Sequence, residues 1–169
     1  WVMDTYSMHV GHTSTAVVTG KPLELGGSLG RREATGRGVM ISTRESAKHL
    51  GLDMTTATVA VQGFGNVGSV SAELIAQLGA RIVAVSDWKG GVYNEKGLDL
   101  AKLQEWVRQH KTVAGFGGGA PLTNEELFGL EVDVLVPAAL ENQITMANAA
   151  GIKARIIVEG ANGPTTPDA

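Results

Sequence analysis

Short apolar runs alternate with amphipathic stretches along most of this chain. Residues 59–61 and 82–85 are continuous apolar runs, which are typical of strands buried on both faces. Between them, apolar residues recur at helical spacing over residues 67–78 until Gly79 ends the pattern. A strand, a helix and a second strand in this order predict a parallel pair joined by a crossover helix.

The same alternation continues toward the C-terminus. Residues 100–110 have one apolar helical face, and residues 132–136 and 154–158 are short, mostly apolar stretches that we expect to be strands. We also expect a helix over residues 144–150. Residues 57–169 are therefore predicted to form an α/β core, with a Rossmann-like open, largely parallel sheet flanked by helices.

Two glycine-containing stretches between these elements are expected to lack regular structure. Residues 88–94 are interpreted as a turn. Residues 115–121 are interpreted as a flexible connector, because no apolar strand feeds their glycines and no Gly-Lys-Ser/Thr ending follows. Thr123 and Glu126 then have the spacing of a capping box, which predicts the start of a helix.

The N-terminal third does not show the alternation of strands and helices. Helices are predicted there at residues 1–10 and 33–50.

The glycine spacing after the first predicted strand is the strongest functional signal. Gly63, Gly65 and Gly68 form a Gly-x-Gly-x-x-Gly turn between a strand and a helix. In dinucleotide sites these glycines allow a tight turn, the approach of a pyrophosphate, and close helix packing. Asp87 follows the second strand, where a carboxylate can accept hydrogen bonds from an adenosine ribose. The pattern predicts a dinucleotide site; a turn without a ligand and a methyltransferase site for an adenosyl cofactor are the alternatives.

Composition narrows the class of protein further. The chain has 169 residues, of which 43% are hydrophobic, enough for one sizeable core. A net charge of −3 without a basic stripe gives no basis for binding nucleic acid or an anionic membrane. No cysteine is present, which excludes disulfides and fits a reducing compartment. We expect a fragment of a cytoplasmic protein. Whether a targeting segment precedes Trp1 in the parent polypeptide stays an open question.

No metal site is expected. His9 and His12 lie three residues apart, but no third ligand is apparent and Gly11 is predicted to end their helix.

Several separate motifs resemble the cofactor domain of glutamate dehydrogenase. They are the stretches at residues 1–7, 19–22, 26–31, 33–39, 137–142 and 159–164, in that order along the chain. The resemblance covers essentially the whole chain and favours glutamate dehydrogenase over the leucine, valine and phenylalanine dehydrogenases. It implies reversible oxidative deamination of L-glutamate to 2-oxoglutarate and ammonia, with hydride transfer to NAD(P). It also implies a homo-oligomer, commonly a hexamer.

The resemblance further implies how the chain is organised. Residues 1–56 would be a helical and loop segment at an inter-domain junction, in the same unit as the dinucleotide-binding core at residues 57–169. The family's substrate domain, with its catalytic lysine and proton-transferring aspartate, precedes the equivalent of Trp1. Lys21 does not match the pattern of that lysine. We therefore expect no catalytic residue in this chain and no activity from it alone.

Roles for individual residues also come from the resemblance. Thr35 and Asn162 are similar to residues that contact the nicotinamide half of the cofactor, and Thr19 and Arg31 to residues of the substrate region. The expected cofactor-binding residues are Thr35, Gly63, Phe64, Gly65, Asn66, Val67, Gly68, Asp87, Ala138, Ala139 and Asn162.

Asp87 also bears on the choice of cofactor. Its carboxylate would bond a ribose 2′-hydroxyl and repel a 2′-phosphate, so NAD is favoured. Arg81 and Lys89 are cations that would offset this repulsion, which leaves NADP or dual use open. The alternative function is a non-catalytic dinucleotide-binding or regulatory module.

Overall fold

The computed structural model describes residues 1–169 and divides into two compact units, Trp1–Ala34 and Thr35–Ala169. Helix α2 (Ala34–His49) lies almost entirely in the second unit, where its Val39 and Ala47 join the main hydrophobic core. The first unit therefore ends well before residue 56. The assignment of the first 56 residues to a domain junction stays a prediction.

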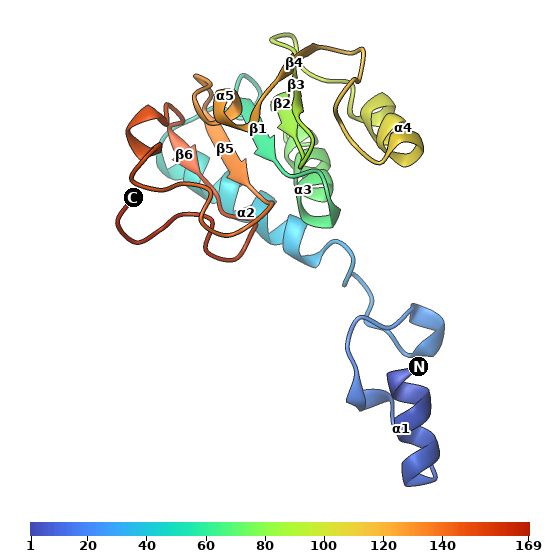
Figure 1. Ribbon diagram of the computed structural model, residues 1–169. Coiled ribbons are helices and arrows are strands. Elements are labelled where there is room, and N and C mark those ends of the chain that lie inside the picture. The colour runs from blue at the N-terminus through green and yellow to red at the C-terminus, as the bar shows by residue number, and fades with distance from the viewer. The chain divides into compact units, whose positions relative to one another are not determined.

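A six-stranded sheet organises the second unit (Figure 1). Its strands are β1 (Thr58–Gln62), β2 (Arg81–Ser86), β3 (Gly91–Tyr93), β4 (Ala120–Leu122), β5 (Val134–Pro137) and β6 (Ile156–Ile157). Their order is β4-β3-β2-β1-β5-β6. Strand β1 is parallel to β2 and β5, and β5 is parallel to β6, whereas β3 and β4 pair antiparallel at one edge. The predicted open, largely parallel α/β sheet is confirmed.

Helices cover both faces of this sheet. Val59 and Val61 of β1 belong to a core shared with α2, α3 (Asn66–Ala76) and α4 (Leu100–His110). Ala60 points into a second core with Leu127 and Phe128 of α5 (Asn124–Phe128). Successive side chains of a strand point to opposite faces, so burial on both sides explains the continuous apolar runs.

The predicted helix over residues 144–150 is wrong. Only a short 3₁₀ helix, η3 (Ala149–Gly151), forms there, and Ile144 makes an isolated bridge to Thr165. The Asn148 carboxamide accepts a hydrogen bond from the Thr145 N–H at 2.8 Å and donates one to the Gln143 carbonyl at 2.8 Å. Asparagine here closes a local turn that competes with helical hydrogen bonds.

The two glycine-containing stretches also differ from prediction at their ends. Residues 91–93 were predicted to belong to a turn but form β3. Residues 120–122 extend from the predicted connector and form β4. An added Cβ at Gly119 would lie 2.3 Å from the Tyr93 carbonyl oxygen, so the glycine permits this close approach. Pro121 is tolerated because β4 lies at the edge of the sheet.

Other predicted boundaries agree to within a few residues. The capping box between Thr123 and Glu126 is confirmed. The last strand is shorter than residues 154–158, and the strand predicted at 132–136 begins at Val134 and ends at Pro137.

The first unit has little core of its own. It contains α1 (Val2–Val10), η1 (Thr15–Val17) and η2 (Leu23–Leu25), and none of these has a buried residue. Gly11 ends α1 in the left-handed conformation, as predicted. The Lys21 ammonium donates hydrogen bonds to the Thr15 and Val18 carbonyls, each at 2.7 Å. No helix of the chain has both the length and the apolar character needed to cross a membrane.

Candidate dinucleotide site

The turn that follows β1 begins with a glycine that no other residue could replace without strain. Gly63 has a φ of 90°, in the range that favours glycine. An added Cβ would lie 2.6 Å from the Ala138 carbonyl oxygen, in the loop after β5. The Gly63 N–H donates to the Ser86 carbonyl at the end of β2, at 2.8 Å. Gly63 therefore lets the loops after three neighbouring strands approach one another.

The other two glycines of the turn have different surroundings. An added Cβ at Gly68 would lie only 1.8 Å from the Gly63 carbonyl oxygen, so close packing of α3 on the turn requires glycine. Gly65 has a φ of −80°, and an added Cβ there would meet nothing within 4 Å. Close contacts with the protein's own backbone thus explain why positions 63 and 68 are glycine, but no such contact explains the glycine at position 65. Its bare backbone faces open space that a ligand can use.

The start of α3 lies at this open position. Gly65 is the N-cap of α3 and has no side chain with which to accept hydrogen bonds from the first helical N–H groups. These groups have no acceptor within the helix, and they lie at the positive end of its dipole. The arrangement suits an anion such as a pyrophosphate.

Two cavities lie along the carboxyl ends of β1 and β5. One, of about 350 Å³, is lined by Gln62, Gly63, Phe64, Gly65, Asp87, Trp88, Asn124, Ala138, Ala139, Leu140 and Gln143. The other, of about 400 Å³, is lined by Thr35, Val67, Ala138, Ala139, Leu140, Glu141, Gly160, Ala161 and Asn162. Residues 138–140 line both, so the two cavities are neighbours. The carboxyl ends of strands are where open α/β sheets bind ligands.

Close helix packing brings Thr35 to the second cavity. An added Cβ at Gly36 would lie 2.6 Å from the Val70 Cγ1 atom of α3, so glycine lets the first turn of α2 approach α3. On the other side, an added Cβ at Gly160 would lie 3.0 Å from the Ala138 Cβ. Two small residues therefore bring Thr35 and Asn162, which are far apart in sequence, to one cavity.

Asp87 is half-buried and fixed by its surroundings. Its Oδ2 accepts a hydrogen bond from the Val113 N–H at 2.7 Å. Its Oδ1 accepts from the Lys89 N–H at 2.8 Å and from the Thr112 hydroxyl at 3.1 Å. Two carboxylate oxygens offer about four acceptor positions, so capacity for a further donor remains. The carboxylate is held at the wall of the first cavity rather than left free to rotate.

Amide side chains tie the loop after β5 to the end of β1. The buried Gln62 donates from Nε2 to the Gln143 Oε1 at 2.7 Å, and Gln143 donates to the Glu141 carbonyl at 3.0 Å. This chain of bonds fixes the loop that lines both cavities.

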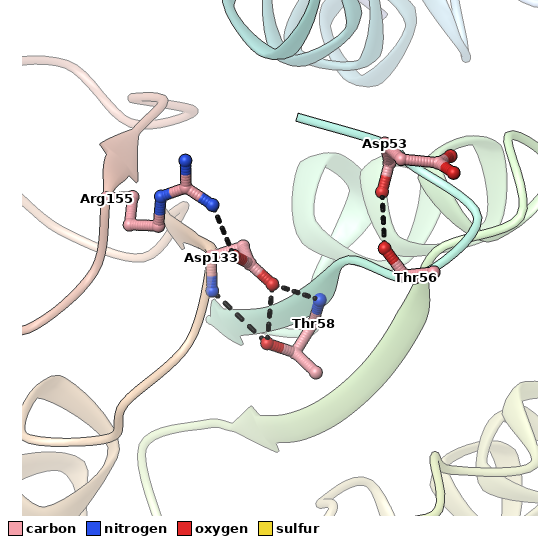
Figure 2. A network of polar contacts seen from close by, with 5 residues as sticks. All are labelled: Asp53, Thr56, Thr58, Asp133 and Arg155. Carbon is pink, nitrogen blue, oxygen red and sulfur yellow. Dashed lines mark hydrogen bonds and ion pairs between the residues drawn. The ribbon is translucent and has the colours of Figure 1, made fainter. Parts of the chain in front are cut away.

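At the amino ends of β1 and β5, side chains form hydrogen bonds that connect the strands. Figure 2 shows Asp133 between Thr58 and Arg155. One Asp133 oxygen accepts from the Thr58 N–H at 2.9 Å and from its hydroxyl at 3.1 Å, and the other accepts from Arg155 at 3.2 Å. Desolvation raises the pKa of Asp133, but the hydrogen bonds from Thr58 and Arg155 outweigh it and leave the pKa below its ordinary value.

Most of the predicted cofactor-binding residues meet at these two cavities, with two exceptions. Asn66 is exposed and Gly68 is buried, and neither lines a cavity. The predicted substrate residues Thr19 and Arg31 are exposed and belong to the first unit, so their role stays a prediction.

Sequence reasoning missed several residues of the site. Gln62 and Trp88 are direct neighbours of predicted site residues, so proximity in sequence was a usable signal for them. Thr112 and Gln143 gave no such signal, because their contacts lie far along the chain.

Comparison with known proteins identifies a matching family and similar relatives. Residues 26–169 match the model of the Glutamate/Leucine/Phenylalanine/Valine dehydrogenase family. Glutamate dehydrogenase from Thermotoga maritima is 58% identical over 170 residues, covering 100% of this chain and 41% of the relative. The NAD-specific glutamate dehydrogenase of Clostridioides difficile is 45% identical, covering 100% of this chain and 41% of the relative.

Solved structures include a similar fold. The leucine-bound form of hetero-hexameric glutamate dehydrogenase from Thermus thermophilus has a TM-score of 0.86 and 42% identity, covering 97% of this chain and 39% of that one. The chain thus spans about 41% of the length of the curated relatives described above. The family match disfavours the methyltransferase alternative. The chain belongs to the Glutamate/Leucine/Phenylalanine/Valine dehydrogenase family.

Proposed function

We propose that this chain is the nicotinamide-cofactor-binding portion of a glutamate dehydrogenase, an oxidoreductase that reversibly deaminates L-glutamate to 2-oxoglutarate and ammonia. The observation that carries the proposal is the contrast among the three glycines. Gly63 and Gly68 are required by contacts within the protein, whereas Gly65 borders open space at the start of α3. The identity with enzymes named glutamate dehydrogenases supports this substrate over the other amino acids of the family.

A dinucleotide matches the chemistry of the cavity walls. Its pyrophosphate would bind at Gly65 and the first N–H groups of α3, and its adenosine ribose would bond to Asp87. Thr35 and Asn162 would hold the nicotinamide half from the second cavity. The cofactor supplies the hydride chemistry when bound, while the residues of this chain bind and orient it.

NAD is the cofactor that these residues favour. Asp87 is held by the Val113 N–H at the cavity wall, where a second negative charge on a 2′-phosphate would be repelled. Arg81 starts β2 and Asp87 follows its last residue, so about six residues at roughly 3.3 Å each separate them. Arg81 is therefore too distant to neutralise a phosphate beside Asp87. Of these two cations, Lys89 is the one that could still allow NADP or dual use.

Substrate binding and assembly are further parts of the proposal. Thr19 and Arg31 would contribute to the site for L-glutamate, and a homo-oligomer would be the working form. Turnover would need the lysine and aspartate of the family's substrate domain, so we expect this chain to bind cofactor without catalysing the reaction.

Calorimetry with NAD and S-adenosylmethionine tests the cofactor class. We expect the chain to bind NAD and to bind S-adenosylmethionine at least tenfold more weakly. The reverse preference would contradict the dehydrogenase assignment. Glutamate-dependent reduction of NAD by a longer polypeptide that contains this chain separates an enzyme from a non-catalytic module, because only an enzyme produces reduced cofactor.

A further inference from the structure

One asparagine of this chain is followed by a glycine. The sequence contains six asparagines, and only Asn162 precedes a glycine, Gly163. A backbone nitrogen can attack the carboxamide of the asparagine before it, which makes asparagine a chemically labile residue. Glycine presents the least hindered nitrogen for this attack, because it has no Cβ. Asn162 also lines the second cavity, so its lability bears on the candidate cofactor site.

Both reacting groups at this position are unengaged. Asn162 and Gly163 are exposed, and the Asn162 carboxamide makes no hydrogen bond. The Gly163 N–H donates no hydrogen bond either. Gly163 has a φ of 58°, and an added Cβ would meet nothing within 4 Å, so the space beside it is open. The nitrogen and the carboxamide are therefore free to react with each other.

The other asparagines lack this combination. Three of them donate hydrogen bonds from their carboxamides to backbone carbonyls, namely Asn94, Asn124 and Asn148. After Asn142, the Gln143 N–H is engaged, since it donates to a backbone carbonyl at 2.7 Å. Asn66 begins α3 and precedes Val67, whose β-branched side chain hinders an attack by its nitrogen. The structure thus singles out Asn162.

We propose that Asn162 deamidates spontaneously, with water as the only co-reactant. The Gly163 nitrogen attacks the Asn162 Cγ atom and forms a C–N bond. The Cγ–Nδ2 bond breaks, and the amide nitrogen leaves as ammonia with the proton of the Gly163 N–H. Water then opens either carbonyl of the resulting cyclic imide, which gives aspartate or isoaspartate at position 162. Loss of the N–H proton makes the nitrogen nucleophilic, so the rate should rise with pH.

Isoaspartate at position 162 alters the loop that lines the second cavity. Its main chain runs through the former side chain and is longer by a methylene group. The loop is anchored on both sides of this position. The Gly160 and Ala161 N–H groups donate to the Pro137 carbonyl at 2.9 and 3.1 Å, and the Gly163 carbonyl accepts an N–H from the loop after β5 at 3.0 Å. The longer chain must therefore shift the residues between these anchors.

The shifted loop should bind NAD more weakly. This second part of the inference rests on the proposed function, which assigns the nicotinamide half of the cofactor to Asn162. Deamidation itself does not depend on that assignment, because it follows from the exposed Asn-Gly pair.

Ageing of the purified chain at mildly alkaline pH tests the chemistry. Peptide mass analysis should show a carboxyl group in place of the carboxamide at position 162 before any other asparagine is converted. Gly163→Ala places a Cβ beside the attacking nitrogen and should slow conversion at least tenfold, about 1.4 kcal/mol in the barrier. Asn162→Gln keeps a carboxamide but requires a larger ring, so it should stay unconverted over the same period. Equal rates at Asn162 and Asn66, or in wild type and Gly163→Ala, would overturn the proposal.

Calorimetry on the aged protein tests the effect on cofactor binding. The number of NAD sites per chain should fall in proportion to the isoaspartate formed, and saturating NAD should slow its formation. Asn162→Gln, aged in the same way, should keep its initial number of sites. A constant number of sites in aged wild type, or no slowing by NAD, would overturn the effect on binding while deamidation stands. Failure of the fresh wild-type chain to bind NAD would overturn the proposed function, and mass analysis would still decide the deamidation.

Discussion

The two ends of β1 and β5 are built for different purposes. At the amino ends, Thr58, Asp133 and Arg155 bond to one another and connect the strands. At the carboxyl ends, glycine and alanine replace such side chains, and two cavities lie beside the turn. Side chains that satisfy one another stabilise the sheet, whereas small residues with unpaired backbone N–H groups leave room for a ligand. Variants at one end should therefore change stability, and variants at the other should change binding.

The largest effect on stability is expected from Gly68→Ala, which should disrupt the packing of α3 on the turn at the carboxyl end of β1. A Cβ placed 1.8 Å from the Gly63 carbonyl oxygen forces α3 away from the turn. We expect a loss of about 3 kcal/mol or more in the free energy of unfolding, measured by urea titration. Gly38→Ala is the matched control, because an added Cβ there meets nothing within 4 Å. Equal stability of the two variants would refute the steric account of Gly68.

At the amino end, Asp133→Ala should lower stability without changing NAD binding. The variant leaves the Thr58 N–H without the carboxylate that accepts its hydrogen bond, at a cost of about 1–3 kcal/mol. Arg155→Ala removes a partner that is 55% exposed and should cost about 0.5 kcal/mol or less. Urea titration measures both effects. A tenfold loss of NAD affinity in a folded Asp133→Ala protein would show that the two ends are not separate.

Asp87→Ser should change the preference between cofactors. Removal of the carboxylate removes a ribose acceptor for NAD and a repulsive charge for NADP. The ratio of their dissociation constants should shift toward NADP about tenfold, equivalent to about 1.4 kcal/mol. Both constants are measured by calorimetry on the same variant, so a general loss of stability cancels in the ratio. A ratio within twofold of wild type would mean that Asp87 does not select the cofactor.

The smallest expected effect concerns acid pH. Hydrogen bonds leave the pKa of Asp133 below its ordinary value. Its contribution to stability is therefore fully present above the unfolded pKa of about 3.9 and is lost as pH falls through the folded pKa. The stability difference between wild type and Asp133→Ala should shrink as the pH falls below about 4. Asp53 and Asp99, whose pKa values are also lowered, are present in both proteins and cancel. A difference that grows toward acid pH would contradict this sign.

Local pattern accounted for the strands and the glycine turn but not for the contacts that complete the site. The runs at residues 59–61 and 82–85 were clear because both faces of the sheet are buried, so every residue is apolar. Strands β3 and β4 have three residues each, too few for a period of two to be visible. The predicted helix at residues 144–150 failed because Asn148 closes a turn there.

The anchoring of Asp87 illustrates the same limit for function. The carboxylate was predictable from its distance to the glycines, but its partners Thr112 and Val113 follow α4 and carry no local signal. Tertiary packing alone brings these residues to Asp87. The acidic residue of the pattern was therefore found, while the groups that hold it were not.

Gly65→Ser tests the central claim most directly, because it should separate stability from binding at one residue. Serine is a favourable N-cap, and its hydroxyl would accept hydrogen bonds from the first N–H groups of α3 in place of a phosphate. We expect the melting temperature to stay the same or rise slightly, while calorimetry shows NAD affinity at least tenfold weaker. A folded Gly65→Ser protein that binds NAD within twofold of wild type would contradict the assignment of this turn to the cofactor pyrophosphate.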